Sequence, residues 1–194
     1  MQISFKQKLP LYTHLIFNNQ TKQFENATFY EITCDDSKDV DYFSKNRQWK
    51  YMDILHDDVC STYNSFLKNN SKKVVNKPFD IKFYSIETDE NDIAAICETN
   101  EFGKNKNIEL LESNNKNYKY AAQTMIACLA KEIIKNSGNK LMVRFPMPMA
   151  MDFYKLGCNF KKDDAGISLN KDGMEDLIGT VEKRVKSRIL DFEV

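Results

Sequence analysis

The chain has 194 residues, enough for one domain with a sizeable extension. Hydrophobic residues make up 42% of it and charged residues 29%, which is typical of a globular protein and excludes a disordered one. The 28 basic residues balance the 28 acidic residues, so no net charge attracts nucleic acid or an anionic membrane. We therefore expect neither partner.

Cysteine and histidine spacing argues against a metal site. The five cysteines form no C-x-x-C pair, and the two histidines offer no ligand spacing. Free thiols suit a reducing compartment, the first segment lacks the apolar region of a signal peptide, and no run approaches the ~20 apolar residues of a membrane span. These features predict a cytoplasmic protein without a metal. The cysteines are Cys34, Cys60, Cys97, Cys128 and Cys158.

The chain is predicted to divide into an N-terminal elaboration, residues 1–75, packed on a core of residues 76–194. Strand-like stretches cover residues 13–17 and 28–34. A helix is expected over residues 59–67, where apolar side chains recur at helical spacing.

From residue 79 the pattern becomes regular. Residues 79–86 alternate between apolar and polar side chains, as a strand with one covered face does. Further strands are predicted over residues 92–99 and 108–113, joined by a turn around Gly103. The strongest helix, residues 120–136, has one apolar stripe and a stop signal at its end.

The C-terminal part continues with shorter elements. We predict a strand over residues 140–145, a short helix over 150–156, and a hairpin of residues 158–162 and 166–169. Residues 174–192 form an amphipathic helix. Its basic residues are expected to face solvent: Lys183, Arg184, Lys186 and Arg188.

This order of elements resembles the core of the GNAT superfamily of N-acetyltransferases. Residues 110–113, Leu-Leu-Glu-Ser, resemble the end of the family's fourth strand, and residues 117–124 stand where the family keeps its pyrophosphate loop. Residues 150–157 resemble the family's helix with a Phe-Tyr pair, closed by Leu-Gly. The resemblance covers residues 79–170. It implies an α/β (α+β) sandwich: a mixed, mostly antiparallel central sheet with helices on both faces, splayed to admit acetyl-CoA.

The resemblance also implies a cofactor-binding segment. Anions bind well to free N–H groups at a helix N-terminus, and a glycine-rich loop lets the backbone approach them closely. Here Asn117 stands at the family's basic or Gln position, Tyr120 takes the first glycine position and Ala122 the second. The residues implied in binding acetyl-CoA are Glu112, Ser113, Asn114, Tyr118, Lys119, Tyr120, Ala121, Ala122, Gln123 and Thr124.

Catalytic candidates follow from the same resemblance. A strand carboxylate acts as general base in the family, and Glu112 is the first candidate because it lies nearest the splayed end of its strand. Glu109 is the second and Glu98, on the neighbouring strand, the third. Alternation along a strand predicts that Glu109 and Glu112 point to opposite faces. Tyr154 resembles the general acid that protonates the departing thiolate, and a backbone N–H within residues 112–114 is expected to polarise the thioester carbonyl.

Together these features imply an acetyl-CoA-dependent N-acetyltransferase that passes the acetyl group directly to an amine of a small molecule or peptide. The alternative is a catalytically inactive GNAT-like module that binds coenzyme A or another protein. The lack of loop glycines and the short spacing from Tyr154 to Gly157 favour it. In a third interpretation, the first seventy residues form a partner-binding surface. The sequence leaves the acceptor and the oligomeric state open, a homodimer included.

Overall fold

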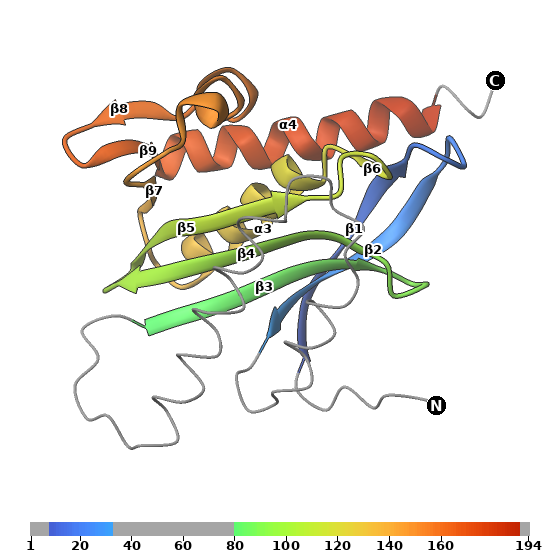
Figure 1. Cartoon of the computed structure of the whole chain (residues 1–194), viewed down its shortest axis with the longest axis horizontal. Helices are drawn as coiled ribbons and strands as arrows, with labels where there is room; N and C mark the ends of the chain where they lie inside the picture. The colour runs from blue at the N-terminus through green and yellow to red at the C-terminus, as the bar shows by residue number, and fades with distance from the viewer. Residues whose placement is uncertain (1–7, 33–79, 191–194) are drawn as a thin grey trace.

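The computed structural model describes residues 8–32 and 80–190, and these contain one sheet of nine strands in the order β6-β1-β2-β3-β4-β5-β7-β9-β8 (Figure 1). Neighbouring strands are antiparallel except β5 and β7, which are parallel. The strands are β1 (Lys8–Asn18), β2 (Phe24–Ile32), β3 (Asp80–Thr88), β4 (Ile93–Phe102), β5 (Asn105–Ser113), β6 (Tyr118–Lys119), β7 (Lys140–Val143), β8 (Lys161–Asp163) and β9 (Gly166–Asn170).

Both N-terminal strands belong to the central sheet. β1 pairs with β2, and β2 pairs with β3 from Ala27 opposite Thr88 to Ile32 opposite Phe83. Residues 8–32 are therefore part of the core sheet. The predicted helix over residues 59–67 and the predicted boundary after residue 75 lie outside the described residues, so both stay predictions.

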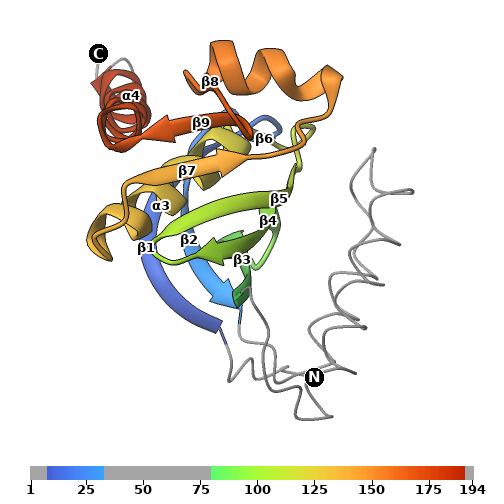
Figure 2. The same cartoon turned by 90° about the vertical axis from the view of Figure 1, so that its left-hand side faces the viewer.

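Helix α3 (Ala121–Lys135) packs on the sheet, and α4 (Lys171–Leu190) packs on α3 and β9 (Figure 2). Most of the apolar stripe of α3 is buried, and Ile126 and Leu129 are fully buried. Burial of one such side chain stabilises the fold by about 1.5–3 kcal/mol. Within the described part of the chain, no helix is both long and apolar enough to cross a bilayer.

Strands β5 and β7 separate soon after they meet. Their parallel pairing is limited to Lys106 opposite Leu141 and Asn107 opposite Met142. Beyond it, the N–H of Arg144 donates to Oδ1 of Asn107 at 3.1 Å instead of to a strand carbonyl. This divergence and the strand order confirm the predicted mixed, mostly antiparallel central sheet.

The short helix predicted over residues 150–156 is irregular. A 3₁₀ turn, η1 (Pro148–Ala150), begins at the proline, and a π-helical turn, η2 (Phe153–Gly157), follows it. Pro148 suits the first position of a helix because the N–H that it lacks has no partner there. The predicted short helix is present, and its geometry is 3₁₀ at the start and π at the end.

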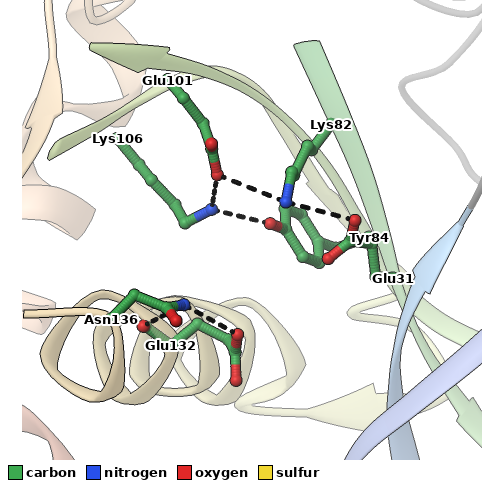
Figure 3. A network of polar contacts seen from close by, with 7 residues as sticks. All are labelled: Glu31, Lys82, Tyr84, Glu101, Lys106, Glu132 and Asn136. Carbon is green, nitrogen blue, oxygen red and sulfur yellow. Dashed lines mark hydrogen bonds and ion pairs between the residues drawn. The ribbon is translucent and has the colours of Figure 1, made fainter. Parts of the chain in front are cut away.

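Charged groups on the α3 side of the sheet pair with one another (Figure 3). Nζ of the buried Lys106 donates to the Tyr84 hydroxyl at 2.8 Å and forms an ion pair with Glu101. Lys82 lies 3.3 Å from the carboxylate of Glu31 and 3.6 Å from that of Glu101. The carboxylate of Glu101 on this side of the sheet therefore has basic partners.

Candidate active site

An irregularity in the pairing of β4 with β5 determines where their carboxylates point. Glu98 lies opposite Leu110, yet its neighbour Thr99 lies opposite Ile108. Glu109 is thus an extra residue in β5. Such a β-bulge interrupts the alternation of side chains along the bulged strand.

The bulge makes one prediction wrong: Glu109 and Glu112 do not point to opposite faces. The register puts Glu112 on the same face as Glu98. The carboxylate of Glu109 accepts hydrogen bonds from Nδ2 of Asn100 at 2.6 Å and of Asn107 at 2.5 Å. Those two asparagines lie opposite each other on that same face. All three candidate bases therefore share one face.

This face is turned away from α3. Cys97, next to Glu98 in β4, points the other way and belongs to the core that includes α3. We call the surface that carries Glu98, Glu109 and Glu112 the acidic face.

Glu98 and Glu112 are buried, and neither forms an ion pair with a basic residue among the described residues. Glu98 is 7% exposed and Glu112 9% exposed, and Oε1 of Glu112 has no hydrogen-bond partner within residues 8–32 and 80–190. Burial raises the pKa of Glu112 to about 7. Burial, and then repulsion from Glu109, raises the pKa of Glu98 to about 7. A carboxyl group that titrates near neutral pH suits general-base catalysis.

At the end of β5, one backbone N–H group points toward the side on which β5 and β7 diverge. The N–H of Asn114 is already used, because it donates to the carbonyl of Ala94 at 2.9 Å. In an antiparallel ladder the hydrogen-bonded pairs alternate, so the pair of Ser113 and Ala95 is not hydrogen-bonded. The N–H of Ser113 therefore points away from β4, toward the side on which β5 and β7 diverge.

The start of α3 carries three backbone donors. The first bond of the helix runs from the N–H of Thr124 to the carbonyl of Tyr120 at 3.0 Å. The N–H groups of Ala121, Ala122 and Gln123 therefore have no carbonyl within the helix to bind. The helix has no side-chain cap and no acidic residue in its first turn. This arrangement suits an anion.

Part of the predicted loop has a structural role instead. The N–H of Tyr118 donates to the carbonyl of Asn114 at 2.8 Å, and its side chain is buried with its hydroxyl 3.1 Å from Asp92. Lys119 pairs with Phe17 in the short ladder of β6 with β1. The donors that the loop offers an anion are therefore fewer than the predicted range of 118–124.

Tyr120 has a backbone conformation that is usual for glycine. Its φ is 67° and its ψ is 8°, in the left-handed region that favours glycine. A bulky aromatic residue seldom adopts this conformation, which costs roughly 1–2 kcal/mol for a side chain with Cβ. The backbone of Tyr120 therefore has a conformation that a glycine would adopt without strain, although the residue here is tyrosine.

Arg184 lies beside the start of α3, which makes the prediction that it faces solvent wrong. Its guanidinium carbon is 4.1 Å from the centre of the Tyr120 ring, and its NH1 donates to Oε1 of Gln123 at 2.6 Å. Gln123 in turn donates to the carbonyl of Gly157 at 2.6 Å. Helix periodicity alone placed Arg184 on the polar side of α4, and no local signal marked the contact.

Tyr154 lies in η2 and is 7% exposed. Its ring packs edge-to-face on Phe153 and Phe160, with ring centres 5.2 and 5.3 Å away. Burial, and then the nearby thiols of Cys97 and Cys158, raises the pKa of its hydroxyl well above the usual value. The hydroxyl is therefore a proton donor at neutral pH. Among the described residues, no hydrogen bond joins it to a candidate glutamate.

No metal-binding cluster of His, Cys, Asp and Glu occurs within residues 8–32 and 80–190. Of the five cysteines, Cys97, Cys128 and Cys158 are described, and all three are free and buried. Burial raises the pKa of Cys128 above its usual value, so this thiol stays protonated.

No family model and no curated protein matches the chain. Among solved structures, it is similar to the ribosomal-protein-S18-alanine N-acetyltransferase from Escherichia coli, at 11% identity and a TM-score of 0.44, over 74% of this chain and 93% of that one. It is also similar to a mutant of a cAMP-binding acyltransferase from Mycobacterium smegmatis, at 9% identity and a TM-score of 0.43, over 93% of this chain and 57% of that one. At these identities and TM-scores, the similarity does not assign an activity or a ligand to this chain.

Proposed function

We propose that the chain is an acetyl-CoA-dependent N-acetyltransferase. The observation that supports the proposal most directly is the start of α3, which has no side-chain cap. It lies in a fold whose strands β5 and β7 diverge, and Glu112 lies near the end of β5. Acetyl-CoA supplies the acetyl group as an activated thioester.

Two features fit the start of α3 to the phosphates of acetyl-CoA. The N–H groups of Ala121, Ala122 and Gln123 form the positive end of the helix dipole. Arg184 places a guanidinium next to this end, bonded to Gln123. Two positive groups repel each other unless an anion lies nearby, so their proximity favours a phosphate ligand. These four residues are the proposed phosphate site.

Glu112 is the proposed general base. Its buried, unpartnered Oε1 is available to accept a proton from an ammonium group, and its raised pKa keeps it within reach of neutral pH. Loss of that proton leaves the acceptor nitrogen with the free electron pair that acyl transfer requires.

Ser113 and Tyr154 are the other proposed catalytic groups. The N–H of Ser113 donates a hydrogen bond to the thioester carbonyl and stabilises the negative charge that develops on its oxygen. The hydroxyl of Tyr154 gives its proton to the leaving sulfur, for which its high pKa keeps it protonated.

The phosphate site is tested with two acetyl donors that differ only in their nucleotide part. We expect acetyl-CoA to bind and acetyl-pantetheine, which lacks the pyrophosphate, to bind much more weakly. Arg184→Leu should weaken acetyl-CoA binding by about tenfold or more and leave acetyl-pantetheine unchanged, whereas Lys183→Leu, on the exposed side of α4, should change neither. Calorimetry measures all four cases, and equal binding of both donors to the wild-type chain contradicts the proposal.

A further inference from the structure

The acidic face holds more negative charge than one general base requires. Glu98 and Glu112 are each more than nine-tenths buried, and Oε1 of Glu112 has no hydrogen-bond partner in the part of the chain that the structure describes. Glu109 adds a third carboxylate to the same face, near enough to Glu98 to disfavour its ionised form. Ionised carboxylates in such a place are costly unless a cation neutralises them.

No basic residue of the neighbouring strands supplies that cation. The described parts of β3, β4 and β5 place no lysine or arginine on this face, because Lys82 and Lys106 point to the α3 side. Arg144 follows β7, and its guanidinium stacks on the ring of Phe102 at 4.2 Å without an ion pair to Glu98 or Glu112. On the α3 side, by contrast, Glu101 has two lysine partners.

The carboxylates are spaced along the strands in a way that suits two positive charges. Glu112 lies opposite Ile96, and Glu98 lies two residues further along β4. Two residues of a strand span roughly 7 Å. A short aliphatic diamine with about four methylene groups separates its two nitrogens by a comparable length, since its bonds are ~1.5 Å long.

We infer that the acceptor is a dication, a short aliphatic diamine, with the reacting nitrogen at Glu112 and the second ammonium held by Glu98 and Glu109. This inference rests on the proposed acetyltransferase function. In the transfer, the reacting ammonium gives one proton to Glu112, and its nitrogen then forms the bond to the acetyl carbon. The carbon–sulfur bond of the thioester breaks, Tyr154 gives its proton to the leaving sulfur, and the second proton that the nitrogen loses returns to the Tyr154 oxygen. The second ammonium keeps its charge throughout.

Binding without acetyl-CoA tests the inference separately from catalysis. Three probes of nearly equal length are titrated into the full chain: 1,4-diaminobutane, 1-aminobutane and 4-aminobutanoate, which carries a carboxylate in place of the second ammonium. We expect the diamine to bind at least about tenfold more tightly than the monoamine, and 4-aminobutanoate to bind most weakly. Equal binding of the diamine and the monoamine overturns the inference.

Glu98→Gln then locates the second charge, because it keeps the shape of the side chain and removes only its charge. It should reduce the preference for the diamine over the monoamine, in binding and in kcat/KM, by about tenfold. Glu90→Gln removes the same charge from the exposed β3–β4 turn and should leave the preference intact. An unchanged preference in Glu98→Gln overturns the inference.

The two proposals fail in different ways. If the chain acetylates 1-aminobutane and 1,4-diaminobutane equally well, the acetyltransferase stands and the diamine inference falls. If the diamine binds in a manner that depends on Glu98 but no acetyl group is ever transferred, the dication site stands and the proposed acetyltransferase falls.

Discussion

Glu112 is the residue on which the proposed chemistry depends most. It is buried near the end of β5, its Oε1 has no hydrogen-bond partner among the described residues, and burial raises its pKa to about 7. Only its ionised form accepts a proton. The proposed reaction should therefore depend on pH in a way that identifies this group.

We expect kcat/KM for the acceptor to rise with pH through about 7 and then level off, as Glu112 loses its proton. Glu112→Gln should lower the rate by about a hundredfold or more and abolish this rise. Glu98→Gln is the control: Glu98 titrates in the same range, so a rise that survives its replacement belongs to Glu112. A rise that persists in Glu112→Gln would assign the base elsewhere.

The same pKa predicts an effect on stability. The folded-state pKa of Glu112 lies above its value of about 4.3 in an unfolded chain. The neutral side chain therefore favours the folded state at low pH, and this contribution is lost as pH rises through about 7. Urea denaturation should show that Glu112→Gln gains stability relative to wild type between pH 5 and pH 8. A constant difference between the two proteins over that range would argue against a raised pKa.

Tyr154 allows a conservative test of the proposed acid. Replacement by Phe removes the hydroxyl and keeps the ring, which packs between Phe153 and Phe160. We expect kcat to fall by about a hundredfold or more while acetyl-CoA binds as before, since general acid catalysis contributes roughly that much. Steady-state kinetics and calorimetry measure both quantities. Transfer at the wild-type rate would show that Tyr154 is only a core aromatic residue.

At the scale of an element, the start of α3 combines a binding feature with backbone strain. Tyr120 adopts a left-handed conformation, and its ring contacts Arg184 and Lys119. The strain and the ring contacts are separable by two substitutions at this one position.

Tyr120→Ala and Tyr120→Gly both remove the ring, but only the glycine variant also removes the strain. We therefore expect the alanine variant to be less stable than the glycine variant by about 1 kcal/mol, measured by urea denaturation. Acetyl-CoA affinity should be unchanged or improved in Tyr120→Gly. A large loss of affinity in that variant would mean that the ring itself contacts the cofactor.

Some elements were predictable because their pattern is local. The apolar stripe of α3 repeats at helical spacing and ends at a Ser-Gly stop, so its predicted bounds are correct to within one residue. The bulge at Glu109 was not predicted, because it arises from how β5 pairs with β4. The adjacent Leu110 and Leu111 break the alternation of β5 but do not by themselves show which residue is the extra one. The contact of Arg184 with Gln123 joins residues far apart in sequence, which helix periodicity does not report.

At the scale of the whole molecule, the order of the predicted elements indicated a mixed, mostly antiparallel sheet. The fold places the candidate groups at two sites. One is the acidic face, with Glu98, Glu109 and Glu112, and the other is the start of α3, with Arg184 beside it. The candidate site was predictable in part. Glu112 and Tyr120 were predicted from the resemblance of the sequence to the family's motifs, whereas the shared face of the three carboxylates depends on strand register.

The most direct test of the account is a calorimetric titration of acetyl-CoA into two variants of the first turn of α3, Ala122→Glu and Ala122→Gln. A carboxylate there stabilises the helix through its dipole but repels a phosphate. We predict that Ala122→Glu binds acetyl-CoA at least about tenfold more weakly than Ala122→Gln while unfolding at the same or a higher temperature. Equal affinity of the two variants, or no binding of millimolar acetyl-CoA by the wild-type chain, would contradict the account.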